Sequence, residues 1–425
     1  MENLQAAAGF AALIVCAWIL SDGKRRFPLR LTLLCIVLQV GLAAAFIHLP
    51  GMASFLSGLN DGVTALGDAT RAGTSFVFGY AGGGPTPFEG GGGATSFILA
   101  FQALPVVLVI SALTALLFHW GIIQAVVRLC AWALRRTLGI GGTEAVSAAA
   151  NVFIGMVEAP ILVAPYLKRL DRSGLFLIMT VGMATIAGTV FGIYAGFLTG
   201  VIPGAAGHLF AASIISLPAA IMIARIMVPV PPEVVQNEQL DVELSFGGEA
   251  DGLQASNMMD AISRGTAAGV KLLISIIALL LVLVALVSLA DMIMAAVLPD
   301  VSGAPLSIER IFTWIFAPVA YAMGIPWAEA GTAGALLGTK TALNELLAYL
   351  ALSQLPPDAL SPRSELILTY ALCGFANFGS LGIMLGGLTA MVPERRADLV
   401  RLAPRSLISG TLATCLTGAT VGILV

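Results

Sequence analysis

The stretch Asn151-Val-Phe-Ile-Gly-Met-Val-Glu-Ala-Pro160 decides how this chain folds. It lies in an apolar segment, 145–167, that has the pair Arg135–Arg136 before it and the pair Lys168–Arg169 after it. Because Lys and Arg gather on the cytoplasmic side of a membrane, both ends of this segment are expected on that side. The segment then has to enter and return as a hairpin, with Glu158-Ala-Pro opening the returning limb.

The composition indicates a membrane protein, as this hairpin requires. Of 425 residues, 58% are hydrophobic and 11% are charged, whereas a soluble domain carries about 25% charged residues. The mean hydropathy is +0.96. The net charge of −3 and the absence of a basic block argue against a nucleic-acid partner. Five cysteines without CxxC spacing indicate no disulfide framework and no metal cofactor.

Eight apolar stretches are close to the roughly 20 residues that a helix needs to cross a bilayer. They lie near 5–21, 29–48, 97–118, 174–199, 204–228, 267–297, 366–391 and 404–425. Basic residues gather near 24–30, 128–136, 168–172 and 395–405, which assigns those sites to the cytoplasm. We therefore expect an all-α polytopic protein of the cell (inner) membrane with both termini extracytoplasmic.

A second hairpin is expected at 326–362, because this segment follows a span that ends outside and precedes one that must start outside. It enters from the opposite face, with its tip between Gly338 and Glu345. Each hairpin is followed by a span whose middle is interrupted by polar residues. The two interruptions share a match, Gly182–Thr185 with Gly374–Asn377, so the halves form an inverted repeat around a midplane site.

The expected organisation has five parts. Residues 1–50 form two peripheral spans, 51–96 an interfacial helix and a glycine-rich loop, 97–228 the first repeat with hairpin 1 (about 143–168), 229–264 a cytoplasmic linker, and 265–425 the second repeat with hairpin 2 (about 326–362). The glycine-rich stretch lacks the Gly-Lys-Ser/Thr ending of a phosphate loop. Nucleotide binding is therefore not expected there.

Glu158 and Glu345 are the leading functional candidates, because an ionisable residue at membrane depth is costly and marks a site or pathway. Each has a plainer interpretation: Glu158 caps the half-helix that it opens, and Glu345 forms a structural ion pair with Lys340. Asn377 and Ser380 share a helix face. They serve either ordinary helix packing or, beside Glu345, the binding of a polyol.

Three motifs make the chain resemble the concentrative nucleoside transporters. They are Asn151–Pro160, Gly338-Thr-Lys-Thr-Ala-Leu-Asn-Glu-Leu-Leu-Ala-Tyr349 and Cys373-Gly-Phe-Ala-Asn-Phe-Gly-Ser380. The resemblance implies a homotrimer with eight transmembrane helices and two opposed re-entrant hairpins in each protomer. It also implies a symporter that imports nucleosides by alternating access, driven by a sodium or proton gradient.

The resemblance also implies roles for particular residues. Glu345, Asn377 and Ser380 would hold the ribose hydroxyls with Asn344 beside them, and Phe375 and Val190 would pack against sugar and base. Asn151, Thr185 and the carbonyls of Ile154 and Ile186 would hold sodium, which suits a monovalent cation because these oxygens are neutral. Protons remain an alternative coupling ion, because Glu158 and Glu345 could carry protons if burial raises the pKa of their carboxyl groups.

The chain departs from the family's usual sequence at the residues expected to contact the nucleobase. The family's first hairpin usually reads Gly-Gln-Ser/Thr-Glu, whereas Met156 and Val157 stand before Glu158 here. An unpaired base edge costs about 1–3 kcal/mol per polar group. We expect altered base selectivity or, as the alternative, a transporter of another polyhydroxylated solute. An enzyme is not expected, because the chain has neither a Gly-x-Ser-x-Gly nor an HExxH motif.

Overall fold

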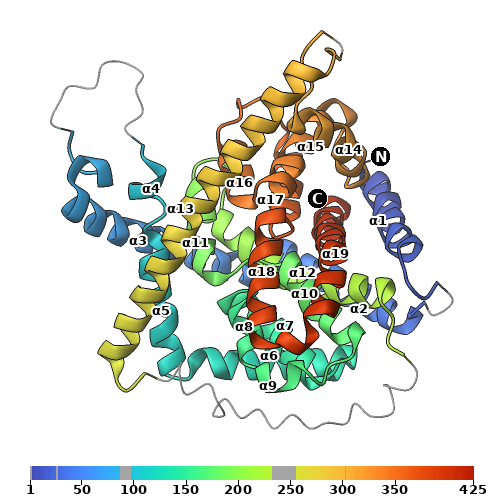
Figure 1. The fold of residues 1–425 in the computed structure, drawn as a ribbon, viewed down its shortest axis with the longest axis horizontal. Helices are drawn as coiled ribbons and strands as arrows, with labels where there is room; N and C mark the ends of the chain where they lie inside the picture. Colours follow the sequence, from blue (N-terminus) through green and yellow to red (C-terminus); the bar gives the residue numbers. More distant parts are fainter. Residues whose placement is uncertain (1, 25–26, 87–96, 232–254, 302) are drawn as a thin grey trace.

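The computed structural model describes residues 2–24, 27–86, 97–231, 255–301 and 303–425 (Figure 1). In these ranges the chain is helical, and its extended structure is limited to an isolated bridge between Val301 and Ala304. The expected all-α fold is confirmed. Much of the expected glycine-rich loop and of the expected linker, at 87–96 and 232–254, lies outside the described residues.

The described part of the chain is built from a succession of helices. In chain order they are α1 (Glu2–Ile19), α2 (Leu29–His48), α3 (Pro50–Phe78), η1 (Gly79–Gly82), α4 (Leu99–Gln102), α5 (Val106–His119), α6 (Ile122–Leu138), α7 (Gly142–Ile154), α8 (Glu158–Ile161), α9 (Ala164–Leu167), α10 (Arg172–Ala184), α11 (Gly188–Leu198), α12 (Ala205–Met227), α13 (Met258–Val297), α14 (Ile308–Ala322), α15 (Trp327–Ala342), α16 (Glu345–Ser353), α17 (Pro362–Leu372), α18 (Phe378–Met391), η3 (Pro393–Arg395) and α19 (Arg396–Leu424).

Among the described residues, seven helical stretches are long and apolar enough to cross a bilayer. They fall at the expected spans except 366–391, where α17 and α18 are two shorter helices separated by residues 373–377. The stretch Arg172–Leu198 is broken too, between α10 and α11 at residues 185–187. Both breaks lie at the internal sequence match, so the polar interruptions end the helices there.

Two helix pairs stand where the hairpins were expected. In Figure 1, α7 to α9 lie at the lower end of the molecule and α15 with α16 at the upper end. The first pair turns at 155–157 and the second at Leu343–Asn344. The second turn begins later than expected, because Gly338 and Lys340 still belong to α15.

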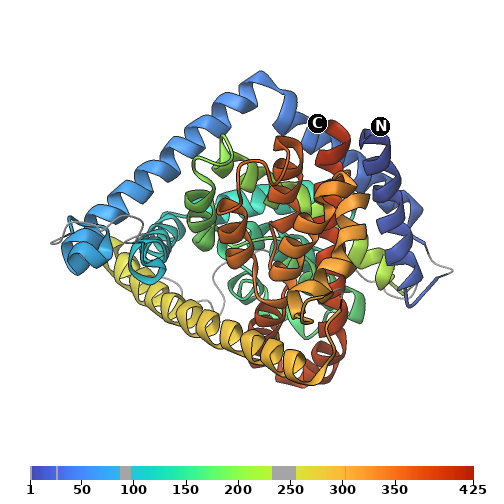
Figure 2. The same ribbon diagram turned by 90° about the horizontal axis from the view of Figure 1, so that it is seen from above.

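Two long helices, α3 and α13, lie at the periphery of the molecule (Figure 2). In Figure 2, α3 and α13 run along two edges of the molecule, and each of them contacts α5. Helix α13 packs closely on α5 at Gly265 and Gly269, where an added Cβ would come within 2.7 Å and 3.0 Å of α5 atoms. Elsewhere it exposes large apolar side chains, including Leu281 at 69% and Val297 at 74%. Such a surface belongs against lipid or protein rather than water.

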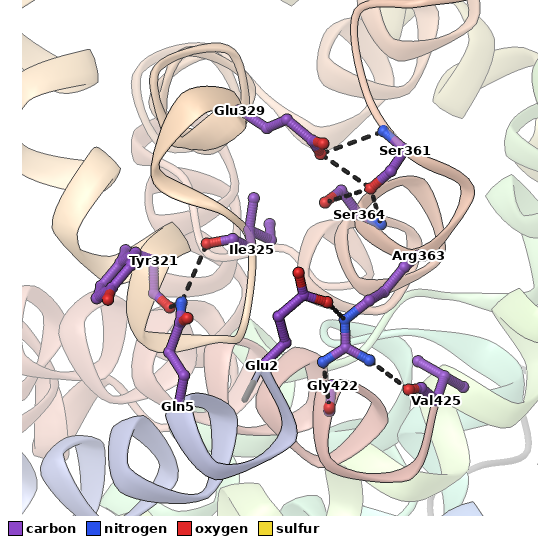
Figure 3. Close-up of polar contacts among 10 residues, drawn as sticks. All are labelled: Glu2, Gln5, Tyr321, Ile325, Glu329, Ser361, Arg363, Ser364, Gly422 and Val425. Atoms are coloured by element: carbon purple, nitrogen blue, oxygen red, sulfur yellow. Dashed lines mark hydrogen bonds and ion pairs between the residues drawn. The ribbon is translucent and has the colours of Figure 1, made fainter.

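The base of the second helix pair is tied to its neighbours by polar contacts (Figure 3). The Glu329 carboxylate of α15 accepts hydrogen bonds from the Ser361 backbone N–H (3.1 Å) and hydroxyl (3.0 Å). Arg363 of α17 lies 3.3 Å from the Glu2 carboxylate and donates to the Gly422 carbonyl at 2.6 Å. These bonds join α1, α15, α17 and α19 at one end of the molecule.

The base of the first helix pair is anchored by a buried ion pair. Arg225 of α12 donates to the Glu144 carboxylate of α7 at 2.5 Å, and both side chains are at most 5% exposed. Arg225 also donates to the Ser173 hydroxyl of α10. Removing one partner of a buried pair costs about 3–5 kcal/mol, so this contact fixes α7 against α10 and α12.

Candidate substrate and cation sites

The tips of both helix pairs and the helix breaks line one cavity. Its volume is about 140 Å³, roughly ten times the space that one water molecule requires. All nine residues expected to bind substrate line it: Met156, Val157, Glu158, Val190, Asn344, Glu345, Phe375, Asn377 and Ser380. The fold therefore brings together positions that lie up to 224 residues apart in the sequence (380 − 156).

Glu345 is a buried carboxylate at the cavity wall that accepts two side-chain hydrogen bonds. It begins α16 and is 4% exposed. Its Oε1 accepts a hydrogen bond from the Tyr194 hydroxyl at 2.6 Å, and its Oε2 accepts one from the Asn377 amide at 2.8 Å. Hydrogen bonds to a carboxylate are shorter and stronger than neutral ones. Two bonds from different helices therefore fix this carboxylate at the cavity wall.

Two asparagines hold the polar side of the site by capping helices. Asn344 accepts from the Leu347 N–H at 2.9 Å and starts α16. Asn377 accepts from the Ser380 N–H at 2.7 Å and starts α18. A side chain in this role stabilises a helix by about 1 kcal/mol. The same Asn377 side chain thus places Ser380 through its oxygen and Glu345 through its nitrogen.

Lys340 has a partner other than Glu345. Its ammonium group is buried and donates to the Ala371 carbonyl and the Thr414 hydroxyl, each at 2.8 Å. Ala371 is in the last turn of α17, where carbonyl groups lack partners within the helix. Lys340 therefore closes the end of α17 at its break, which is a favourable place for a cation.

The opposite wall of the cavity is apolar. Gly155 ends α7 with a φ of 104°, and an added Cβ would lie 2.9 Å from the Glu158 carboxylate and 3.0 Å from Ala187. Met156 is 8% exposed, and Val157 packs against α18 at Gly387. Helix α8 begins at Glu158 without a side-chain cap. Glu158 is exposed and faces the cavity as the charged group of this tip.

The four residues expected to hold a cation lie beside the cavity, where α7 meets the break between α10 and α11. The Asn151 amide donates to the Val181 carbonyl at 3.2 Å and to the Thr185 hydroxyl. Both side chains are nearly fully buried, at 3% and 0%. Ile154 ends α7, and Ile186 lies in the break that follows α10.

This arrangement directs the C-terminal ends of α7 and α10 toward one place. The last carbonyls of a helix lack partners inside it and carry the negative end of the helix dipole. The Phe375 N–H of the second break donates to the Thr185 carbonyl at 3.3 Å. The two helix breaks therefore touch, and the residues expected to hold a cation adjoin the cavity wall that carries Phe375.

Several residues that line the cavity are not among those predicted from the sequence. Tyr194 is buried at 1% exposure and binds Glu345 directly. Its sequence signal was weak, namely a spacing of four residues from Val190, which places both on one face of α11. Leu272, Ile276 and Leu283 of α13 close another side. Their apolar character is the same as that of lipid-facing residues, so it did not distinguish them.

An all-helical membrane chain with broken helices, opposed helix pairs and, between them, a cavity with one polar wall has the architecture of a secondary transporter. The models for the Na+ dependent nucleoside transporter C-terminus and N-terminus match residues 208–422 and 8–81, and a nucleoside recognition model matches 100–200. The chain belongs to the Na+-dependent nucleoside transporter family, that is, to the concentrative nucleoside transporters. It is an integral membrane transporter and not an enzyme.

Relatives match along the whole chain. The nucleoside permease NupC of Helicobacter pylori is 32% identical over 428 residues, covering 100% of this chain and 98% of the permease. The sodium/nucleoside cotransporter 1 of Rattus norvegicus is 34% identical, covering 100% of this chain and 64% of that protein. The structure of CNTnw in an inward-facing substrate-bound state has a TM-score of 0.87 at 30% identity, covering 100% of this chain and 98% of that one.

The fold also matches CNTnw in another conformation. An outward-facing variant has a TM-score of 0.86 at 30% identity, covering 100% of this chain and 98% of that one. One architecture therefore exists in inward-facing and outward-facing states, as alternating access requires.

Proposed function

We propose that this chain is a symporter that imports nucleosides across the cell (inner) membrane, driven by a sodium gradient. The observation that carries the proposal is the Glu345 carboxylate, held by Tyr194 and Asn377 at the wall of the shared cavity. A carboxylate accepts hydrogen bonds from two donors at once. The vicinal hydroxyls of a ribose supply such a pair of donors.

The other lining residues divide between the two ends of a nucleoside. Asn377 and Ser380 supply further polar groups for the sugar, and Asn344 supports them from the tip of hairpin 2. Phe375 and Val190 pack against sugar and base. The base end faces Met156, Val157 and Glu158, so base selectivity depends on one charged and two apolar residues.

Sodium is the proposed coupling ion. Asn151 and Thr185 offer an amide and a hydroxyl oxygen, and the carbonyls of Ile154 and Ile186 complete a set of neutral oxygen ligands. The two converging helix ends support this assignment, because both add negative potential without a formal charge. Proton coupling through Glu158 or Glu345 is the competing mechanism.

The proposal includes an assembly and an orientation. The exposed apolar surface of α13 supports burial in a homotrimer. The basic residues near 24–30, 128–136, 168–172 and 395–405 support a cytoplasmic position for those sites and an extracytoplasmic position for both termini.

A second candidate is a cation-coupled transporter of another polyhydroxylated solute. The apolar pair Met156–Val157 favours it, because these side chains offer no hydrogen bond to a base edge. Competition against labelled uridine separates the candidates. We expect inhibition by nucleosides and none by free ribose; stronger inhibition by a free polyol than by nucleosides would favour the second candidate.

The coupling ion is tested with purified protein in proteoliposomes. A sodium gradient at equal pH should drive accumulation of labelled uridine, and a proton gradient without sodium should not. Accumulation driven by protons alone would refute the sodium assignment.

Thr185→Val removes one proposed cation ligand while keeping the side-chain volume. We expect the sodium concentration for half-maximal uptake to rise at least tenfold. This is the effect of losing one polar contact about as strong as a hydrogen bond. Thr199→Val is the matched control, because Thr199 is the C-cap of α11 and, among the described contacts, its hydroxyl donates only to the Ala195 carbonyl. Equal sodium dependence in both variants would remove Thr185 from the cation site.

A further inference from the structure

Tyr194 contacts the substrate site from the other repeat. It lies on α11, four residues after the cavity residue Val190, whereas Glu345 begins α16. Its hydroxyl donates to Glu345 Oε1 at 2.6 Å, and the side chain is 1% exposed. A phenol has one proton to donate. That proton is committed to the carboxylate expected to bind the ribose.

Each oxygen of the Glu345 carboxylate accepts a hydrogen bond from a different residue. Tyr194 occupies a position on Oε1 and Asn377 one on Oε2. An ionised carboxylate offers about four acceptor positions, two on each oxygen. Both oxygens therefore keep acceptor capacity for the cavity, and neither is free to rotate away. This arrangement fits two hydroxyl donors held side by side on adjacent carbons.

The Tyr194 ring is held in place independently of its hydroxyl. The Tyr349 ring lies 5.1 Å away, centre to centre, at an angle of 30°. Tyr349 in turn donates its hydroxyl to the Thr369 carbonyl of α17 at 2.8 Å. The two tyrosines are therefore neighbours with similar burial, but only one of them bonds to Glu345 among the described contacts.

We propose that Tyr194 is a positioning residue that holds the Glu345 carboxylate in the orientation for a cis-diol, and that this contact sets the preference for ribonucleosides over deoxyribonucleosides. The proposal rests on the proposed function and deepens it by naming the substrate class. Loss of the phenol hydroxyl leaves Oε1 without its protein donor. The carboxylate then has no fixed plane to present to both ribose hydroxyls.

The test is equilibrium binding of uridine, 2′-deoxyuridine and 3′-deoxyuridine to the purified full-length protein in saturating sodium. We expect the uridine Kd of Tyr194→Phe to rise by about tenfold. We also expect the preference for uridine over at least one deoxy analogue to shrink several-fold. Tyr349→Phe is the matched control, and it should keep the wild-type preference because its hydroxyl serves Thr369.

An unchanged preference ratio in Tyr194→Phe would overturn the proposal, whatever happens to the absolute affinities. A ring that only packs would weaken all three ligands by the same factor. Equal loss of preference in Tyr349→Phe would also overturn it, because the effect would then come from the aromatic pair and not from the Glu345 contact.

If Tyr194→Phe does not fold, a different replacement at the same position tests the proposal. A ring-fluorinated tyrosine at position 194 keeps the shape and makes the hydroxyl a stronger donor, so it should change the preference ratio. The same replacement at position 349 should not, and identical ratios for both would contradict the proposal. If the wild-type protein binds no nucleoside, the proposed function fails and this inference with it. If it does bind nucleosides and only the Tyr194 results fail, the transport proposal stands.

Discussion

The tips of the two helix pairs face the same cavity but are built differently. The tip of hairpin 2 carries Asn344, which caps α16, and Glu345, whose two oxygens both accept hydrogen bonds. The tip of hairpin 1 turns at Gly155 and continues into α8 without a side-chain cap. Beyond that turn the chain returns as two four-residue helices, whereas α16 has nine residues.

This difference separates two tasks. The hairpin 2 side is a polar site that the protein holds ready through Asn377, Tyr194 and a capped helix. The hairpin 1 side offers apolar surface from Met156 and Val157 with one exposed charge, Glu158. In the proposed function, a site that is fixed at one end and less constrained at the other would recognise a constant sugar strictly and a variable base loosely.

The largest effect is expected at Lys340, which supports the hairpin 2 side. Lys340→Met leaves the Ala371 carbonyl unpaired and removes the cation from the end of α17. We expect a loss of about 3 kcal/mol in the free energy of unfolding, measured by thermal unfolding in detergent. Lys271→Met on the exposed side of α13 is the control and should be nearly neutral. Equal stability of the two variants would remove Lys340 from this structural role.

A smaller effect is expected at the turn of hairpin 1. Gly155→Ala places a Cβ where φ is 104° and where the Glu158 carboxylate and Ala187 lie within 3.0 Å. Such strain costs about 1–3 kcal/mol and should reduce the rate of uridine uptake more than it reduces protein yield. The control is Gly41→Ala, because a Cβ there meets nothing within 4 Å. Full uptake by Gly155→Ala would show that the tip tolerates distortion.

The smallest effect is expected from restoring polarity to the apolar wall. Replacing Met156–Val157 by Gln–Thr adds hydrogen-bonding groups at the base end, each worth about 1 kcal/mol. Competition against labelled uridine by different nucleosides should then show base preferences shifted by up to about tenfold. The preference for ribose should stay as in the wild type. A shift in ribose preference without a shift in base preference would contradict the division of tasks.

Much of this fold can be predicted from the sequence, because the positions of its helices depend on local features of the chain. Runs of apolar residues predicted the spans, flanking basic pairs predicted the first hairpin, and the order of the spans predicted the second. The repeated glycine and polar positions at 182–185 and 374–377 predicted the helix breaks. At the second break, the side chain of Asn377 caps the helix that begins there, α18. Each of these signals involves only a few neighbouring residues, so it can be recognised in the sequence without knowledge of the tertiary structure.

The remainder depends on contacts between distant elements. Lys340 lies five residues before Glu345, but it bonds to α17 and α19 instead. Tyr194 looks like an ordinary core aromatic until α16 places Glu345 against it, 151 residues away. Packing between elements that are distant in the chain decides both contacts. Helix α6 is different, because its buried residues recur at helical spacing, which is a local signal: Ile123, Val127, Ala131, Leu134 and Leu138.

The central claim, that the hairpin 2 carboxylate binds the sugar while the hairpin 1 carboxylate does not, is tested most directly by uridine binding to Glu345→Gln and Glu158→Gln. Glu345→Gln keeps the shape but loses the charge and half of the acceptors for two hydroxyls, each bond being worth about 1.5–3 kcal/mol. We predict that its uridine Kd rises by about a hundredfold or more, against tenfold or less for Glu158→Gln. An unchanged Kd in Glu345→Gln, or a larger loss in Glu158→Gln, would contradict the account.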